Sequence, residues 1–414
     1  MTNDVVLAWR NLRRNRRRTL LSMGGIAFAA ALLVFMLSMQ ASQYQVMLRA
    51  AANGGTGYLQ AQAEGYLDDA RMWLVIPEPG PVAAALQAEP RVTAVTKRAE
   101  GFSLLASETH AQGALVIGVD PAGETGVTNL ASGLRSGELL TPDDFDQGFI
   151  GVLLARNLGV DLGDAVTVLG TARDGSVAAG QVIVKGILET GQPELDRATL
   201  YVPLAFFDEV YRMEGAVHRV IVRTDTLWNL QPVARRLTAS FTDTGMSGHP
   251  PVVLTWRELL PGLLEAIQLD MLIGGAMYVI LVLVVAFSIL NTFIMAVYER
   301  TREFGVMMAI GTTPWRLVRV LTLESAFLTF GGIVLGILLG GAVTAWVADV
   351  GIYFGQDAAD YMKQFGLPPR IYPELSIYTA LLGPFAVFTV TMIAALFPAL
   401  RIRRMRPVEA LRTA

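Results

Sequence analysis

Four stretches of this chain contain no charged residue, and each is long enough to cross a lipid bilayer as a helix. These charge-free windows are residues 19–48, 271–298, 325–348 and 375–400. Each runs for 24 to 30 residues, whereas a helix needs about 20 apolar residues to cross the hydrocarbon core. Only 17% of the whole chain is charged, against about 25% in ordinary soluble domains. The windows therefore predict four transmembrane α-helices and exclude a soluble enzyme, a disordered chain and a fibrous rod.

The charges outside the windows are unevenly distributed. Six Lys or Arg residues lie in residues 1–18, four in residues 299–324 and five after residue 400. The loop at 349–374 has only Lys363 and Arg370 against four acidic residues. Positively charged loops stay on the cytoplasmic side, so we expect a multi-pass membrane protein with both termini cytoplasmic. Because the chain has no cysteine, disulfides contribute nothing to its stability.

The basic segment at residues 1–18 has three interpretations. It contains six arginines, with Trp9 directly before the first and Leu12 between the first two, a pattern typical of an amphipathic entry helix on anionic membrane lipid. A nucleic-acid-binding arm is the second interpretation, but the charge-free window that follows directly argues against a nucleic-acid partner. A cleaved signal peptide is the third, but the window exceeds the apolar core of roughly 7 to 15 residues found in such peptides.

The long segment between the first two windows has an ordinary charge density and alternates between strand-like and helix-like stretches. Residues 49–255 are therefore predicted to form a large α+β extracytoplasmic domain, inserted between the first span with its stalk (19–48) and the second. Residues 256–298 form a stalk and the second span, because 271–298 alone exceeds the hydrocarbon thickness. We expect strands at 57–63, 114–119, 182–188 and 217–222, helices at 81–88, 149–158 and 256–267, a short periplasmic loop at 349–374 and a cytoplasmic tail at 401–414.

Two features inside the windows indicate contact with other helices. Gly332, Gly336 and Gly340 recur at four-residue spacing in the third window, which clears one helix face for the close approach of a partner. Asn291 lies in the second window, where an amide costs free energy unless it finds a hydrogen-bond partner. We assign all four residues to an interface with a partner.

Catalytic and nucleotide-binding patterns are missing from the sequence. A Walker A loop needs a Gly-Lys pair, and none of the three lysines follows a glycine. The three histidines lie far apart and cysteine is absent, which excludes the common short-spaced zinc signatures. Three carboxylates at 143–146 follow a Thr-Pro pair and are better explained as capping a helix start. We therefore expect neither a catalytic nor a metal site.

The loop between the second and third windows, residues 299–324, carries a distinctive pattern. Charges at 299, 300, 302 and 303 are followed by an apolar side formed by Phe304, Met307 and Met308. The pattern predicts a short amphipathic helix that presents aromatic and methionine side chains to a protein partner. A solvated connector is the alternative, but such a loop would seldom place these three side chains together in water.

This stretch resembles the signature of the MacB/FtsX-type ABC transporter permeases, closest in pattern to the lipoprotein-releasing (LolC/LolE-like) branch. In that family an Asn in the second span leads into Glu-Arg-x-Arg-Glu and a Gly, then Ala-x-Gly, then the Glu-Ser that opens the third span. The same residues stand here at 291, 299–305, 309–311 and 324–325. The Arg-rich entry at 9–15 and the Pro-Val-Glu-Ala-Leu ending at 407–411 fit the family, and the run at 185–191 is similar to the lipoprotein-releasing branch. Met307-Met308 is a departure, since relatives often carry a basic residue there.

The resemblance implies a non-catalytic membrane subunit with no cofactor of its own. A separate ABC ATPase dimer, carrying ATP and magnesium, would grip the cytoplasmic loop, and a second permease copy or a paralogue would complete the transporter. Nucleotide-driven closure would move the stalks and the periplasmic domains, a mechanism called mechanotransmission. The resemblance also places the chain in the bacterial inner membrane. The permease interface would include Asn291, Gly332, Gly336 and Gly340. The ATPase-coupling helix would comprise Glu299, Arg300, Arg302, Glu303, Phe304, Gly305, Met307 and Met308.

Several functions are compatible with these patterns. The leading hypothesis is a permease that extracts or exports a hydrophobic or lipidated substrate from the periplasmic side, with a periplasmic or outer-membrane acceptor as a further partner. The alternatives are an FtsX-like device that regulates a periplasmic enzyme and a MacB-like drug or peptide exporter. FtsX-like relatives tend to have smaller periplasmic domains, and a membrane-tethered enzyme rests only on unplaced carboxylates.

Overall fold

The computed structural model describes residues 2–402, except 15, 129, 244–249 and 365–366. It divides into two compact units. The membrane unit comprises Met1–Gln45, Ala266–Tyr353 and Arg370–Ala414, and the periplasmic unit comprises Val46–Glu265 and Phe354–Pro369. The predicted tail at 401–414 lies outside the described residues from position 403 onward.

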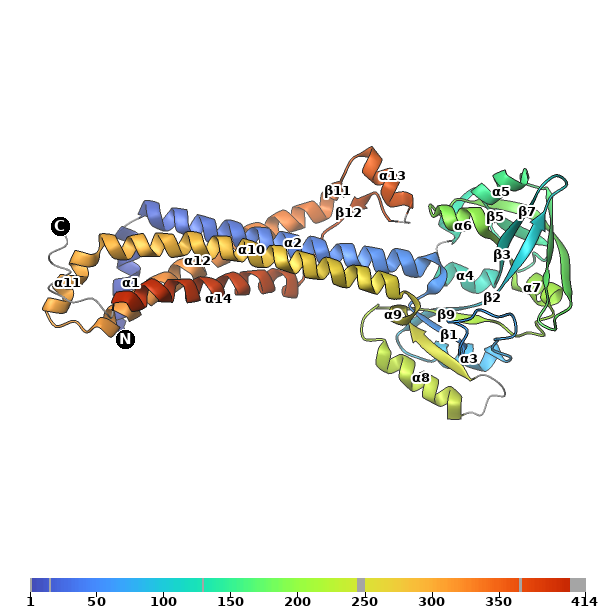
Figure 1. The fold of residues 1–414 in the computed structure, drawn as a ribbon, viewed down its shortest axis with the longest axis horizontal. Helices are drawn as coiled ribbons and strands as arrows, with labels where there is room; N and C mark the ends of the chain where they lie inside the picture. Colours follow the sequence, from blue (N-terminus) through green and yellow to red (C-terminus); the bar gives the residue numbers. More distant parts are fainter. Residues whose placement is uncertain (1, 15, 129, 244–249, 365–366, 403–414) are drawn as a thin grey trace. The chain divides into compact units, whose positions relative to one another are not determined.

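Four long helices form the membrane unit and lie side by side (Figure 1). They are α2 (Arg16–Ala51), α10 (Pro261–Glu299), α12 (Pro314–Val350) and α14 (Ile377–Ile402), and all four are long and apolar enough to cross a membrane. Each contains one charge-free window, which confirms the four predicted transmembrane helices. Buried side chains from all four pack together, among them Ile26, Leu33, Val282, Ile289, Leu328, Ile333 and Val387.

The three spaced glycines lie where α12 approaches α2 of the same chain. A Cβ built at Gly336 would lie 2.6 Å from the Cβ of Ala30, and one at Gly340 would lie 2.8 Å from the Cα of Ala31. Gly332 is similarly close to Ile26. The assignment of this face to a second permease is therefore corrected: the glycines allow close packing within the chain's own bundle. Their spacing indicates that a helix approaches, but not which chain supplies it.

The periplasmic ends of α2 and α10 are joined by hydrogen bonds. Tyr44 donates to Asp270 at 2.6 Å, Gln40 donates to the same carboxylate at 3.3 Å, and Tyr278 donates to Gln40 at 3.1 Å. Gly274 faces Gln40, and a Cβ there would lie 2.7 Å from the Gln40 amide nitrogen. These contacts hold α2 and α10 together around Asp270, which lies just before the second charge-free window begins.

Short elements complete the ends of the bundle. At the end of the bundle where α2 begins these are α1 (Thr2–Arg14) and α11 (Thr301–Ala309). Gly311, with φ of 101°, ends the α11 segment, and Thr313-Pro314 starts α12 with proline in its first turn. Between α12 and α14 lie β11 (Ile352–Tyr353), α13 (Gln356–Gln364) and β12 (Arg370–Ile371).

The periplasmic unit is a mixed α+β domain, as predicted, and lies between α2 and α10 in the chain. Its strands are β1 (Leu59–Ala63), β2 (Val92–Ala106), β3 (Ala111–Val119), β4 (Leu134–Gly137), β5 (Gln147–Gly151), β6 (Ala165–Thr171), β7 (Val177–Leu188), β8 (Thr199–Pro203), β9 (Arg219–Thr224) and β10 (Pro251–Thr255). Its helices are η1 (Ala52–Thr56), α3 (Pro79–Gln87), α4 (Pro121–Val127), η2 (Leu130–Gly133), α5 (Val152–Leu158), α6 (Pro193–Ala198), α7 (Leu204–Tyr211), α8 (Gln231–Asp243) and α9 (Trp256–Leu259).

The ten strands form one sheet, part of which closes on itself. The order is β10-β1-β9-β2-β3-β8-β5-β7-β4, and β6 pairs with both β7 and β2. The pairings β2-β3-β8-β5-β7-β6-β2 make a closed cycle, so these six strands form a small barrel around buried aliphatic residues from every strand. Phe206, Phe207 and Tyr211 of α7 are also buried in this core.

Three local predictions are wrong in part. Residues 149–151 belong to β5, and the predicted helix at 149–158 begins only at Val152. The carboxylates at 143–146 do not start a helix, because Asp144 accepts hydrogen bonds from the amide and hydroxyl of Thr141 in a turn and pairs with Lys185. The predicted helix at 256–267 is interrupted at Leu260, where Pro261 cannot donate the backbone hydrogen bond that would continue it.

A buried ion pair holds the start of the periplasmic unit to its sheet. Arg98 of β2 and Glu124 of α4 form a salt bridge with side chains only 4% and 6% exposed. Arg98 also donates to the carbonyl of Gly55 at 3.2 Å, and Thr128 donates to Glu124 at 2.6 Å. Since Gly55 lies in η1, directly after α2, this pair connects the end of the α2 helix to the sheet.

Candidate functional site

Helix α11 contains most of the signature residues and packs its apolar side inward. Phe304 is 2% exposed and lies among Val297, Leu317, Leu321 and Ala399. Met307 and Met308 are half-buried against the same cluster, and Gly305 is buried. The prediction that Phe304 and the methionines face a protein partner is therefore corrected. A helix of nine residues is too short to be stable alone, so its apolar side packs on the cytoplasmic ends of α10, α12 and α14.

Arg300 joins α11 to α12. Its side chain is 12% exposed, and its guanidinium donates to Glu303 at 3.1 Å and to Glu324 at 3.3 Å. The guanidinium also lies 5.4 Å from the centre of the Phe304 ring. Asn11 of α1 donates to the same Glu324 oxygen at 3.4 Å. Glu324 therefore receives hydrogen bonds from two different elements.

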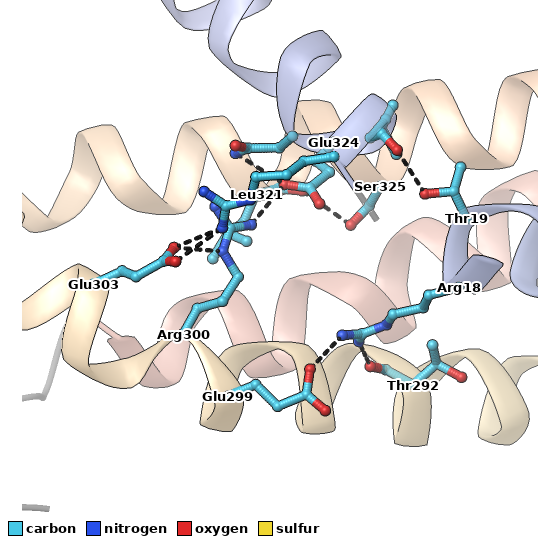
Figure 2. A network of polar contacts seen from close by, with 12 residues as sticks. Arg18, Thr19, Thr292, Glu299, Arg300, Glu303, Leu321, Glu324 and Ser325 are labelled. Atoms are coloured by element: carbon cyan, nitrogen blue, oxygen red, sulfur yellow. Dashed lines mark hydrogen bonds and ion pairs between the residues drawn. The ribbon is translucent and has the colours of Figure 1, made fainter. Parts of the chain in front are cut away.

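Glu303 belongs to this network, and Arg18 and Glu299 form a second group of polar contacts (Figure 2). Arg14 donates to both carboxylate oxygens of Glu303 at 2.9 and 3.0 Å, and Arg18 pairs with Glu299 at 3.1 Å and also donates to the carbonyl of Thr292. Partial burial opposes ionisation of Glu303, but the hydrogen bonds from Arg14 and Arg300 outweigh it and lower its pKa. The charges at 299, 300 and 303 thus hold this chain's own elements together.

The outward face of α11 consists of different residues. Arg302 is exposed, Val306 is 43% exposed and Ile310, just beyond the helix, is 81% exposed. They follow one another at four-residue spacing, so they lie on one side of the helix. We call Arg302, Val306 and Ile310 the outward face of α11. The four-residue spacing of these three residues could have indicated this face from the sequence. The prediction instead followed the more apolar cluster of Phe304, Met307 and Met308.

Asn291 lies on α10 and is exposed. Among the residues that the structure describes, its amide has no hydrogen-bond partner. An amide in a membrane helix costs free energy until it finds a hydrogen-bond partner, which here lies outside the described residues. The placement fits the predicted interface role of Asn291 and differs from that of the three glycines.

A metal site is not present in the described part of the chain. Within those residues, no group of three or more His, Cys, Asp or Glu side chains could hold a metal ion.

Comparison with known proteins gives consistent results along the chain. A sequence profile of the MacB-like periplasmic core domain matches residues 19–240, and one of the FtsX-like permease C-terminal region matches residues 275–407. The chain is 26% identical over 347 residues to the lipoprotein-releasing system transmembrane protein LolC of Xylella fastidiosa strain Temecula1, covering 80% of each chain. It is 23% identical over 415 residues to LolC of Neisseria meningitidis, covering 95% of this chain and 94% of that one. The macrolide export protein MacB of Acinetobacter baylyi is 23% identical over 346 residues, covering 80% of this chain and 49% of the relative.

Proposed function

Because this chain belongs to the MacB/FtsX-type family of ABC transporter permeases, we propose that it is the membrane subunit of a transporter powered by a separate ATPase dimer. ATP and magnesium are bound by that partner. The chain lies in the bacterial inner membrane with both termini in the cytoplasm, as its basic cytoplasmic segments favour.

The outward face of α11 is the observation that carries this proposal. It places an exposed arginine beside two exposed aliphatic side chains, on a helix whose other side is anchored among three membrane helices. An anchored helix with an exposed apolar tip is suited to insert into a groove of a soluble partner. Arg302 adds a positive charge that would pair with an acidic side chain at the rim of such a groove.

Continuous helices support transmission of movement as the mechanism. Helix α12 begins within the cytoplasmic loop and runs unbroken to Val350, and α10 runs unbroken from Pro261 to Glu299. The charge-free windows supply no acidic or basic side chain for an ion relay. Movement of α11 by the ATPase is passed along these helices to the periplasmic side.

The substrate class follows from the relatives. Two of them are named as lipoprotein-releasing proteins, so we assign a hydrophobic or lipidated substrate that is extracted on the periplasmic side. A second permease copy or a paralogue contacts the exposed Asn291 on α10.

A periplasmic acceptor is supported by the outer surface of the barrel. Phe102 and Val177 are 73% and 76% exposed there. Leu104 and Leu169 pair across β2 and β6 and are also exposed. Apolar side chains gathered on one face of a soluble domain indicate a protein or lipid partner.

Binding of the ATPase by the outward face of α11 is tested with two isoleucines of nearly equal exposure. Ile310→Ala removes the apolar tip of α11, and Ile377→Ala is the matched control, because Ile377 is 82% exposed at the start of α14. The ATPase subunit that co-purifies with this chain is titrated against each variant in lipid nanodiscs. We expect Ile310→Ala to weaken binding roughly tenfold or more, from the loss of about 1.5–3 kcal/mol of buried side chain, and Ile377→Ala to leave it unchanged. Equal binding by both variants would refute the proposal that the outward face of α11 binds the ATPase.

A further inference from the structure

Helix α1 packs on α12 along one side. Ala8 is fully buried, Leu12 is 8% exposed, and Trp9 contacts the ring of Phe327 edge-on at a centroid distance of 6.1 Å. On another side Val5 and Val6 are 41% and 53% exposed. The helix thus has an apolar side available to membrane lipid and a separate side that contacts the bundle.

Both ends of α1 form ion pairs with the helices of the coupling region, one with α12 and the other with α11. Near its start, Asp4 accepts a hydrogen bond from Arg316 of α12 at 2.8 Å, and Arg319 lies 3.8 Å away. At its end, Arg14 pairs with both carboxylate oxygens of Glu303 in α11. The side chain of Asp4 is only 7% exposed, and the hydrogen bond from Arg316 lowers its pKa.

Membrane anchoring alone does not account for these contacts. Attraction to anionic lipid depends on the number of positive charges near the surface and needs no particular partner. Asp4 is the one acidic residue among residues 1–18, and a carboxylate would be repelled by such lipid. Its burial between two arginines of α12 indicates that this end of α1 is specified by protein contact.

We propose that α1 is a positioning element of the coupling apparatus, which holds α11 at a fixed place on α12 so that movement of α11 is passed to α12. Asp4 and Arg14 are its positioning residues. Asn11 of α1 also contributes, because it donates a hydrogen bond to Glu324 of α12. Arg300, at the start of α11, donates to the same carboxylate. The inference rests on the proposed function, because it requires that an ATPase moves α11.

An exchange of two residues separates positioning from anchoring. Asp4→Arg combined with Arg14→Asp keeps the composition and net charge of residues 1–18 identical, but it breaks both ends of the contact. The variant is reconstituted with its ATPase in vesicles of phosphatidylethanolamine and phosphatidylglycerol. We expect ATPase binding to persist, since the outward face of α11 is intact, and the permease-dependent change in ATP turnover to fall roughly threefold or more, because two pairs become repulsive.

Re-pairing and a matched control complete the test. Re-pairing is tested at the Asp4 end alone, because Glu303 also accepts a hydrogen bond from Arg300. Asp4→Arg by itself should lower the turnover, and adding Arg316→Asp, which restores opposite charges, is expected to recover it. Arg13 is an exposed neighbour that has no ion pair among the described residues, so Arg13→Asp should have less effect than Arg14→Asp.

Full turnover in the exchanged variant, a loss that re-pairing does not recover, or equal effects at positions 13 and 14 would each overturn the inference. A natural chain that neither binds the ATPase nor alters its turnover would instead refute the proposed function, and this inference with it.

Discussion

Acidification should destabilise the periplasmic unit through His218. This side chain is fully buried, its Nδ1 accepts a hydrogen bond from the Glu100 amide at 3.0 Å, and its Nε2 donates to the Met72 carbonyl at 3.2 Å. It stacks on Tyr66 at a centroid distance of 5.2 Å. Burial lowers the pKa of His218 from 6.5 to about 4. A proton on Nδ1 would also break the hydrogen bond from Glu100.

The sign follows from comparing the folded and unfolded chains. Well above pH 6.5 the imidazole is neutral in both, so the titration has no effect on stability. Between pH 6.5 and about 4 only the unfolded chain takes up the proton, so the free energy of unfolding falls as the pH falls. The difference between the two pKa values corresponds to a loss of about 3 kcal/mol across this window.

The measurement is urea unfolding of residues Val46–Glu265 on either side of that window, with His218→Gln as the control. Carboxylates elsewhere titrate equally in both proteins, so the difference between their losses isolates the histidine. We expect the natural sequence to lose about 3 kcal/mol more than the variant on acidification. Equal losses in the two proteins, with both folded at neutral pH, would show that the buried imidazole does not control acid stability.

Three further predictions concern packing. Phe304→Ala should cost about 3 kcal/mol by opening a cavity under α11, seen as a lower Tm of the full chain in detergent; an unchanged Tm would contradict the inward packing. Gly336→Leu should cost about 1–3 kcal/mol by pushing α12 away from Ala30 of α2, seen as a smaller folded fraction after heating, and a wild-type fraction would mean that the helices do not touch there. Arg98→Met should lower the free energy of unfolding by about 3–5 kcal/mol, because it leaves Glu124 buried and unpaired. Urea unfolding should show a smaller loss of this free energy when Glu124→Leu is added to Arg98→Met. An equal loss in the single and double variants would contradict this cause.

The membrane helices could be predicted from the sequence because lipid imposes a strict rule. A window without charge and longer than the hydrocarbon core has few alternatives to a transmembrane helix. The same windows contain no information on which helices touch, so the spacing of Gly336 and its neighbours indicated a close approach but assigned it to the wrong chain. Helix contacts depend on the arrangement of the whole bundle.

The cytoplasmic site shows a different limit. An apolar stripe on a short helix is consistent with packing inward and with binding a partner, and the sequence pattern alone favoured the second for Phe304. What decides is the presence of an apolar cluster from α10, α12 and α14, whose most distant member, Ala399, lies 95 residues from Phe304 in the sequence. Arg98 and Glu124 are likewise separated by 26 residues, and the strand predicted around His218 did not indicate that its ring is fully buried.

The unbroken course of α12 has a mechanical consequence. With 37 residues, the helix is about 55 Å long, and the groups that would receive force from the ATPase sit at one end of it. If it pivots near that end as a stiff lever, a tilt of about 5° displaces the far end by about 5 Å. The glycine-lined contact with α2 leaves little space for α12 to bend. A small rotation of α12 at the end next to α11 would therefore displace its other end by nearly the rise of one helical turn.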